Sequence, residues 1–200
     1  AQKLGLNKIS DIAKKLDIYS NIPEVLSISL GSAETTLLRL TNAYCTFVNG
    51  GKKVTPILID RIQDRRGKTI FNSDKRKCLG CENISYLDEE IPILQDNLEQ
   101  IISPSTAYQI TSMLEGVVKR GTGKKLRTLN LPLAGKTGTT NKNMDTWFVG
   151  FTSKIVIGVY VGFDEPKSLG RYETGAKVSL PIFKSFIENV ATKEEALPFK

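Results

Sequence analysis

The sequence contains no histidine, which removes the commonest general base and the commonest metal ligand. A Ser-His-Asp triad is therefore excluded, and any acid–base chemistry must use Lys, Asp, Glu or Tyr side chains. Cysteine is scarce as well, with only Cys45, Cys78 and Cys81 present. Because a closed zinc site takes four Cys or His ligands, we predict no metal site, and no motif indicates a cofactor.

Two of the cysteines form a C-x-x-C motif, Cys78-Leu79-Gly80-Cys81, in a polar and turn-rich stretch. A thioredoxin-like motif lies beside a βαβ pattern, and none surrounds this one. We interpret the pair as a small loop closure, which becomes a disulfide if the compartment is oxidising. Cys45 lies within a helical pattern and is interpreted as a small buried apolar residue.

Long apolar runs are also missing. The longest, Ile155 to Phe163, has nine residues and is interrupted by Gly158 and Gly162. A membrane-spanning helix needs about 20 apolar residues, so none is predicted. The first residues show neither an initiator Met nor a charged segment followed by an apolar stretch, so no signal peptide can be identified. We expect any membrane anchor or targeting signal to lie in a part of the parent protein outside this chain.

Positive charge is in excess, with a formal net charge of +7 at pH 7. This sign favours anionic partners such as an acidic polymer, an acidic lipid or nucleic acid. Proteins that bind single-stranded nucleic acids interleave their basic residues with aromatic ones. The basic clusters of this chain lack such aromatics, so nucleic acid is not predicted as a partner.

Apolar residues recur at helical spacing in four segments. The segments are residues 4–17, a helix capped by Ser32 that stops at Gly50, a helix capped by Ser103 with Pro104 at its first position, and a helix from Pro181 with Ile182, Phe183, Phe186, Ile187 and Val190 as its buried face. The caps and stops follow the usual preference for Ser before a helix and Gly after it.

Strands are predicted between these helices. A hairpin joins residues 54–63 to residues 68–71, and three strands follow at 131–139, 146–152 and 154–163. The three are joined by connections too short for helical crossovers, so they should pair antiparallel. The last is apolar on both faces, which requires cover on both sides. We therefore predict an α+β fold in one domain over residues 1–192, with a polar loop insertion at 72–100 and a charged tail at 193–200.

The chemistry is carried by Lys136-Thr137-Gly138-Thr139 on the first of the three strands. Side chains alternate along a strand, so Thr137 and Thr139 lie on one face. Gly138 has no side chain, which permits a ligand or another backbone to approach closely. Two hydroxyls, free backbone amides and the Lys136 ammonium make a plausible site for an extended peptide and its terminal carboxylate.

The K-T-G tripeptide is a signature of penicillin-binding proteins and class A β-lactamases. The surrounding sequence resembles class A, bifunctional penicillin-binding proteins over most of the chain. The resembling stretches are 30–36, 47–51, 103–123, 136–141, 145–151 and 161–164. The resemblance implies a penicillin-binding/β-lactamase-like transpeptidase fold, with a five-stranded antiparallel sheet between helices. It also implies D,D-transpeptidation of peptidoglycan stem peptides through an acyl-serine, at the periplasmic face of the inner membrane.

Site roles follow from the same resemblance, where residues match. Thr137 and Thr139 would bind the carboxylate of the stem peptide or of a β-lactam, and Gly138 would permit close approach. Lys136 would contribute to the positive field and to proton transfer. The backbone N–H of Thr139 would be one oxyanion-hole donor. Asp145 and Trp147 are interpreted as structural residues.

The family's serine motifs are absent. No serine is followed three residues later by Lys, and no S-x-N occurs. We therefore expect the chain to be the C-terminal part of a transpeptidase domain, with its nucleophile on a preceding N-terminal part. Without that part the chain is predicted to be inactive.

Three other interpretations compete with this one, and the residues disfavour the first. A phosphate-binding loop would need a glycine at position 130 and a helix after Thr137, and the chain has Asn130 and a strand. A β-lactamase-like serine hydrolase shares the K-T-G signature and the fold. The third is a non-catalytic fragment that binds anionic envelope polymer through its net charge.

Overall fold

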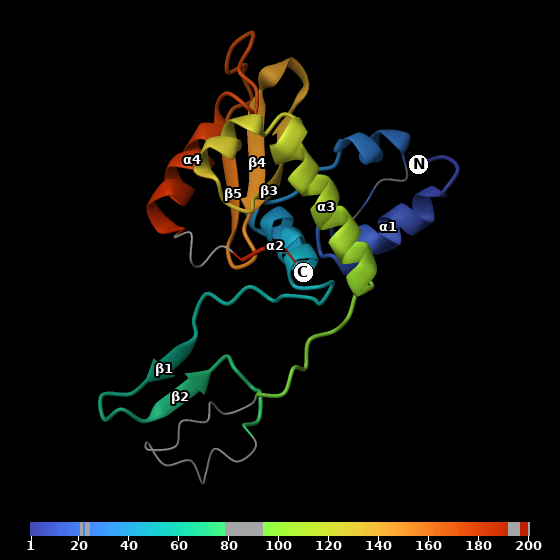
Figure 1. The fold of residues 1–200 in the computed structure, drawn as a ribbon. Helices are drawn as coiled ribbons and strands as arrows, with labels where there is room; N and C mark the ends of the chain where they lie inside the picture. Colours follow the sequence, from blue (N-terminus) through green and yellow to red (C-terminus); the bar gives the residue numbers. More distant parts are fainter. Residues whose placement is uncertain (21, 23–24, 79–93, 192–196, 200) are drawn as a thin grey trace. The chain divides into compact units, whose positions relative to one another are not determined.

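A computed structural model describes residues 1–20, 22, 25–78, 94–191 and 197–199. The chain divides into two compact units (Figure 1). The larger unit comprises Ala1–Val54 and Gln100–Lys200, and the smaller comprises Thr55–Glu99. The candidate motif at residues 136–139 belongs to the larger unit.

The first predicted helix is confirmed as α1 (Leu6–Lys15), and the second as α2 (Leu37–Val48). The cap predicted for the second helix is wrong. Thr36 caps α2, because its Oγ1 accepts a 3.2 Å hydrogen bond from the Arg39 N–H. Ser32 lies one turn earlier, after the short 3₁₀ helix η1 (Leu26–Leu30), and its Oγ donates to Ser27 Oγ instead.

This difference predicts the effects of two substitutions. Thr36→Ala removes the capping oxygen and is expected to lower the free energy of unfolding by about 1 kcal/mol. Ser32→Ala removes an exposed hydroxyl that caps nothing, so a change within about 0.5 kcal/mol is expected. Thermal melts of the two variants beside the parent chain measure both. Equal destabilisation by the two would contradict the assignment of the cap.

The three predicted strands form one antiparallel sheet in the order β3-β4-β5. They are β3 (Ala134–Thr139), β4 (Asp145–Phe151) and β5 (Val156–Gly162). The described residues thus place three strands in this sheet, whereas the family resemblance implies five. β3 begins three residues later than predicted, since it pairs only as far as the end of β4, where Ala134 lies opposite Phe151.

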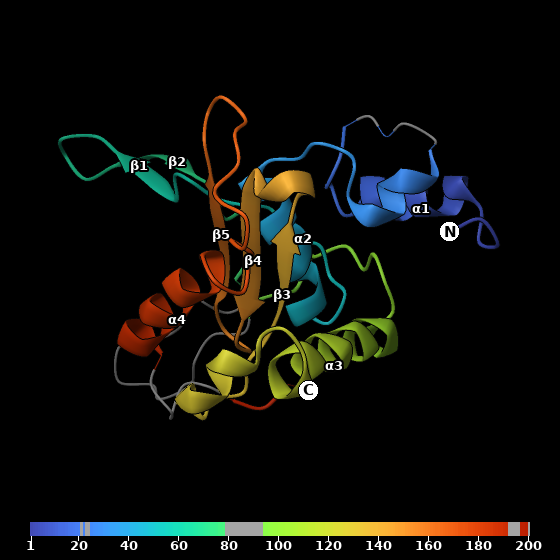
Figure 2. The same cartoon turned by 90° about the horizontal axis from the view of Figure 1, so that it is seen from above.

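Helices cover both faces of this sheet (Figures 1 and 2). α2 contacts β5 from one face, and α4 (Ser179–Val190) contacts β4 and β5 from the other. The prediction that the last strand is covered on both sides is therefore confirmed. α3 (Pro104–Arg120) contacts β3 and begins as predicted, with Ser103 Oγ accepting from the Thr106 N–H at 3.2 Å.

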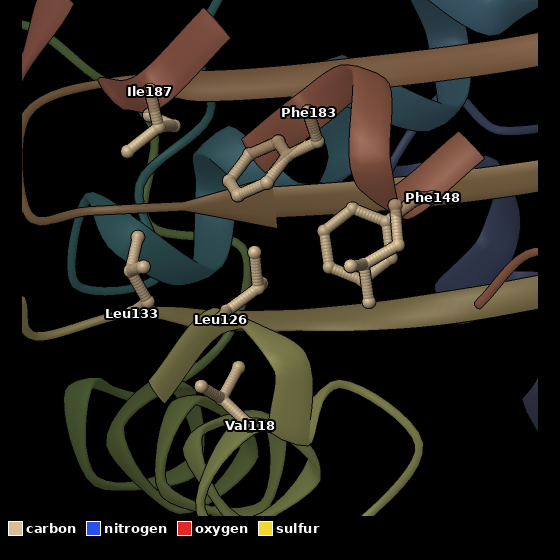
Figure 3. Packing of buried hydrophobic residues seen from close by; sticks show 7 residues of the cluster. Val118, Leu126, Leu133, Phe148, Phe183 and Ile187 are labelled. Carbon is tan, nitrogen blue, oxygen red and sulfur yellow. The ribbon is translucent and has the colours of Figure 1, made fainter. Parts of the chain in front are cut away.

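The core lies where the sheet packs against α4, α3 and the short 3₁₀ helix η3 (Lys124–Leu129), and Figure 3 shows its side chains. The rings of Phe148 and Phe183 meet edge to face with their centroids 4.9 Å apart. Gly150 makes room for them, because a Cβ at this position would lie 2.6 Å from Phe148 and 2.7 Å from Phe183. The cluster is completed by Val118, Leu126, Leu133, Leu180 and Ile187.

The buried face predicted for α4 is wrong in part. Phe183 and Ile187 are fully buried, but Ile182, Phe186 and Val190 are 50%, 51% and 40% exposed. Only the stripe that continues Leu180, Phe183 and Ile187 at intervals of three and four faces the sheet. The exposed three lie along the flank of this buried stripe, where they line a surface depression with Pro181, Ser185 and Asn189.

The smaller unit contains the predicted hairpin, with β1 (Arg61–Gln63) paired antiparallel to β2 (Thr69–Asn72). Asp64 closes its turn by accepting from the backbone N–H groups of Arg66 and Lys68 at 2.8 and 2.9 Å. The first strand is shorter than predicted, because residues 55–60 join no strand ladder.

Where the structure describes them, the cysteines agree with the sequence interpretation, except that Cys45 is half-buried and not buried. Cys78 is disulfide-bonded and Cys45 is a free thiol. Burial raises the pKa of the Cys45 thiol, which keeps it protonated and unreactive near neutral pH. Cys81 lies outside the described residues.

Candidate functional site

The Lys136-Thr137-Gly138-Thr139 motif lies on β3, as predicted. Among the described residues, β3 pairs only with β4, which leaves its other edge open. Lys136 and Thr139 are exposed, and Thr137 and Gly138 are half-buried. This edge of β3 therefore forms no strand ladder with any other described residue.

The register of β3 against β4 determines which side chains share a face. Thr137 lies opposite Phe148, and Thr139 lies opposite Thr146. Partners opposite each other in an antiparallel pair project to the same side. Both hydroxyls of the motif thus belong to the face on which Phe148 packs against α4, at the exposed end of the strand.

Each of the two hydroxyls has one partner outside the strand. Thr137 Oγ1 lies 2.9 Å from Thr122 Oγ1, and Thr139 Oγ1 accepts a 3.0 Å hydrogen bond from the Gly175 N–H. The Lys136 ammonium donates to the Thr137 carbonyl at 2.8 Å. The Thr139 oxygen therefore accepts from a backbone donor, whereas in the contact between Thr122 and Thr137 either hydroxyl can be the donor.

Gly138 and Gly175 permit a close approach of backbones beside the motif. A Cβ on Gly138 would lie 3.0 Å from the Trp147 Cβ. A Cβ on Gly175 would lie 2.5 Å from the Gly138 carbonyl oxygen and 2.6 Å from that of Trp147. Close approach at Gly138 was expected from the sequence. The part played by Gly175 was missed, since no local pattern indicates a residue that lies so far along the chain from the motif.

The loop before α4 is fastened to the β3–β4 connection. This connection contains η4 (Asn141–Asn143), in which Lys142 and Asn143 have left-handed φ values of 60° and 54°. Asn143 Nδ2 donates to the carbonyls of Gly170 and Arg171 at 2.9 and 3.0 Å. These bonds hold the loop near the end of β3, where Gly175 reaches Thr139.

Asp145 and Trp147 support the sheet on its other face. Trp147 Nε1 donates to Asp145 Oδ1 at 2.9 Å, and the Trp147 ring meets the Tyr160 ring with a centroid distance of 4.7 Å. This arrangement supports the interpretation of both as structural residues. In the part of the chain that the structure describes, no group of three His, Cys, Asp or Glu side chains has the arrangement of a metal site.

Comparisons with known proteins give one consistent result. Residues 1–188 match the family model described as the penicillin binding protein transpeptidase domain. Penicillin-binding protein 1A of Rickettsia felis is 48% identical over 203 residues, which cover 100% of this chain and 26% of the relative. The chain thus spans about a quarter of the length of the curated relatives it matches.

Two solved structures are similar to the whole chain. The crystal structure of penicillin-binding protein 1A from Haemophilus influenzae has a TM-score of 0.77 and 28% identity, covering 98% of this chain and 33% of that one. The PonA1 protein of Mycobacterium tuberculosis in complex with penicillin V has a TM-score of 0.66 and 20% identity, covering 96% and 52%. The second similarity supports the fold alone.

Proposed function

Since this chain belongs to the penicillin-binding protein transpeptidase domain family, we propose that β3 binds the terminal carboxylate of a peptidoglycan stem peptide or of a β-lactam. The observation that carries the proposal is a strand edge that pairs with no other described strand, with two hydroxyls on one face of β3 and an ammonium that donates to the Thr137 carbonyl. A peptide that extends along β3 gains main-chain hydrogen bonds from the edge. Its carboxylate accepts from Thr137 and Thr139 in the positive field of Lys136.

The complete reaction is D,D-transpeptidation. A serine Oγ attacks the carbonyl carbon of the penultimate residue of the stem peptide, the terminal residue leaves with its new amine proton, and an acyl-serine remains. An acceptor amine then displaces the serine. The Thr139 N–H stabilises the oxyanion that forms in each step.

The serine of this reaction comes from another part of the complete protein. Neither S-x-x-K nor S-x-N occurs in the 200 residues, so the chain supplies the carboxylate-binding strand and not the nucleophile. We place the parent protein at the periplasmic face of the inner membrane, where its substrate is. No helix in the described part of this chain is long and apolar enough to cross a membrane.

The net charge of +7 favours a second candidate function, binding of anionic envelope polymer without catalysis. Attraction between exposed charges weakens as the Debye length shortens. Pull-down with peptidoglycan across a salt series tests this candidate, because the amount of chain bound should fall as the salt concentration rises. Binding that does not change with salt contradicts it. A β-lactamase-like hydrolase would instead show fast deacylation in the complete domain.

The carboxylate role of Thr139 can be tested by Thr139→Val in the complete domain. The substitution keeps the shape and the backbone N–H but removes the hydroxyl, so acylation by penicillin V is expected to slow about three- to tenfold. The matched control is Thr128→Val, because Thr128 is an exposed threonine on η3 (Lys124–Leu129) whose hydroxyl donates to the Lys125 carbonyl, away from β3. Unchanged acylation in Thr139→Val would remove its side chain from carboxylate binding.

A further inference from the structure

We infer that Thr122 is a positioning residue that directs the hydroxyl proton of Thr137 towards the substrate carboxylate. The inference rests on the proposed function of β3. Its starting point is the 2.9 Å contact between Thr122 Oγ1 and Thr137 Oγ1, which joins two residues 15 apart in the sequence.

The chain around Thr122 is folded tightly by its two neighbouring glycines. α3 ends at Arg120, and the N–H groups of Gly121 and Gly123 both donate to the Val117 carbonyl at 3.0 Å. A Cβ on Gly121 would lie 3.0 Å from Val117 backbone atoms, and a Cβ on Gly123 would lie 3.2 Å from the Val117 carbonyl oxygen. The Gly-Thr-Gly sequence therefore turns the chain back over the last turn of α3, and the turn places the Thr122 hydroxyl against β3.

The role of Thr122 follows from which group donates and which accepts in each hydrogen bond. A threonine hydroxyl has one proton to donate and two lone pairs to accept with. Thr139 Oγ1 accepts from the Gly175 N–H, which can only donate, so the Thr139 proton is left for a ligand. A carboxylate held by both threonines needs a proton from Thr137 as well. Thr137 must then accept from Thr122, and Thr122 is the donor of the pair.

Thr137 and Thr139 have different kinds of hydrogen-bond partner. Thr139 is supported by a backbone N–H, which no side-chain substitution removes. Thr137 is supported by a side-chain hydroxyl, which Thr122→Val deletes at nearly constant shape. In Thr122→Val, the Thr137 hydroxyl loses its donor and is free to rotate away from the ligand.

The experiment measures the second-order rate of acylation of the complete domain by penicillin V and by its methyl ester, which lacks the carboxylate. Thr122→Val is expected to slow acylation by penicillin V about three- to tenfold, which is the usual effect of one lost hydrogen bond. Thr122→Ser keeps the hydroxyl and should restore the rate. The methyl ester should react with Thr122→Val and with the parent domain at the same rate.

A double-mutant cycle tests whether Thr122 acts through Thr137. In a Thr137→Val background, adding Thr122→Val should cause no further loss. A further loss as large as in the parent would mean that Thr122 contacts the ligand itself, which would overturn the inference. So would an equal loss with the methyl ester, because that result indicates a general structural defect. Thr128→Val serves again as the matched control.

Failure of the inference can be told apart from failure of the proposed function. If Thr137→Val slows acylation by penicillin V and Thr122→Val does not, only the positioning role of Thr122 is wrong. If neither Thr137→Val nor Thr139→Val slows it, carboxylate binding by β3 is wrong, and the role of Thr122 is wrong with it.

Discussion

The 200-residue chain by itself is expected to remain unlabelled by a fluorescent penicillin, at any concentration that labels a complete penicillin-binding protein. β-Lactam acylation needs a serine activated by a neighbouring base. None of the serines here has a Lys three residues later, and there is no histidine to replace it. A chimera that joins the upstream segment of the Rickettsia felis relative to Ala1 is expected to become labelled. Denaturing gels with fluorescence detection measure both results.

Two controls make the labelling result decisive. The first replaces the serine of the S-x-x-K motif in the chimera with alanine, which should abolish the labelled band. The second heats the 200-residue chain before exposure, since slow aminolysis by exposed lysines labels folded and unfolded chains alike. Specific labelling of any residue in the native chain would overturn the assignment of the nucleophile to an upstream segment.

The largest effect on stability is expected from Phe183→Ala. Phe183 is fully buried, and its ring packs 4.9 Å from that of Phe148 in the core between α4 and the sheet. Truncating a buried Phe removes apolar contacts and leaves a cavity, which costs about 3–5 kcal/mol. Small domains have a free energy of unfolding of only about 5–15 kcal/mol. The expected loss is therefore a large fraction of the stability of this chain. Urea denaturation measures the loss.

Phe186→Ala is the matched control for this prediction. It removes the same side chain from the same helix, but Phe186 is 51% exposed, and a loss below about 1 kcal/mol is expected. If Phe183→Ala does not fold, Phe183→Leu leaves a smaller cavity and should lie between the two. Equal losses at positions 183 and 186 would mean that the buried stripe of α4 is assigned incorrectly.

Local sequence patterns were sufficient to predict most helices and strands of this protein. Ser103 and Pro104 determine the start of α3, because a capping oxygen and a residue with no N–H suit the first turn of a helix. The run of apolar residues from Ile155 to Phe163 indicated β5, and its apolar character on both faces indicated cover on both sides. The strand that carries residues 136–139 was likewise predicted from local composition.

Local patterns were insufficient where more than one residue suited the same structural role. Ser32 was predicted as the cap of α2, but the structure shows that Thr36 accepts the bond from the Arg39 N–H instead. The apolar residues of α4 outnumber the positions that can face the sheet. The sequence pattern alone therefore did not separate Phe183, which is buried, from Phe186, which is exposed.

The sequence by itself determined that Thr137 and Thr139 place their hydroxyls on one face of β3, because the alternation of side chains along a strand is a property of the backbone. The tertiary structure decided how those hydroxyls are oriented. Thr122 and Gly175 reach Thr137 and Thr139 from residues 15 and 36 positions away. Such contacts depend on how helices and loops pack around the sheet, and no local pattern encodes that packing.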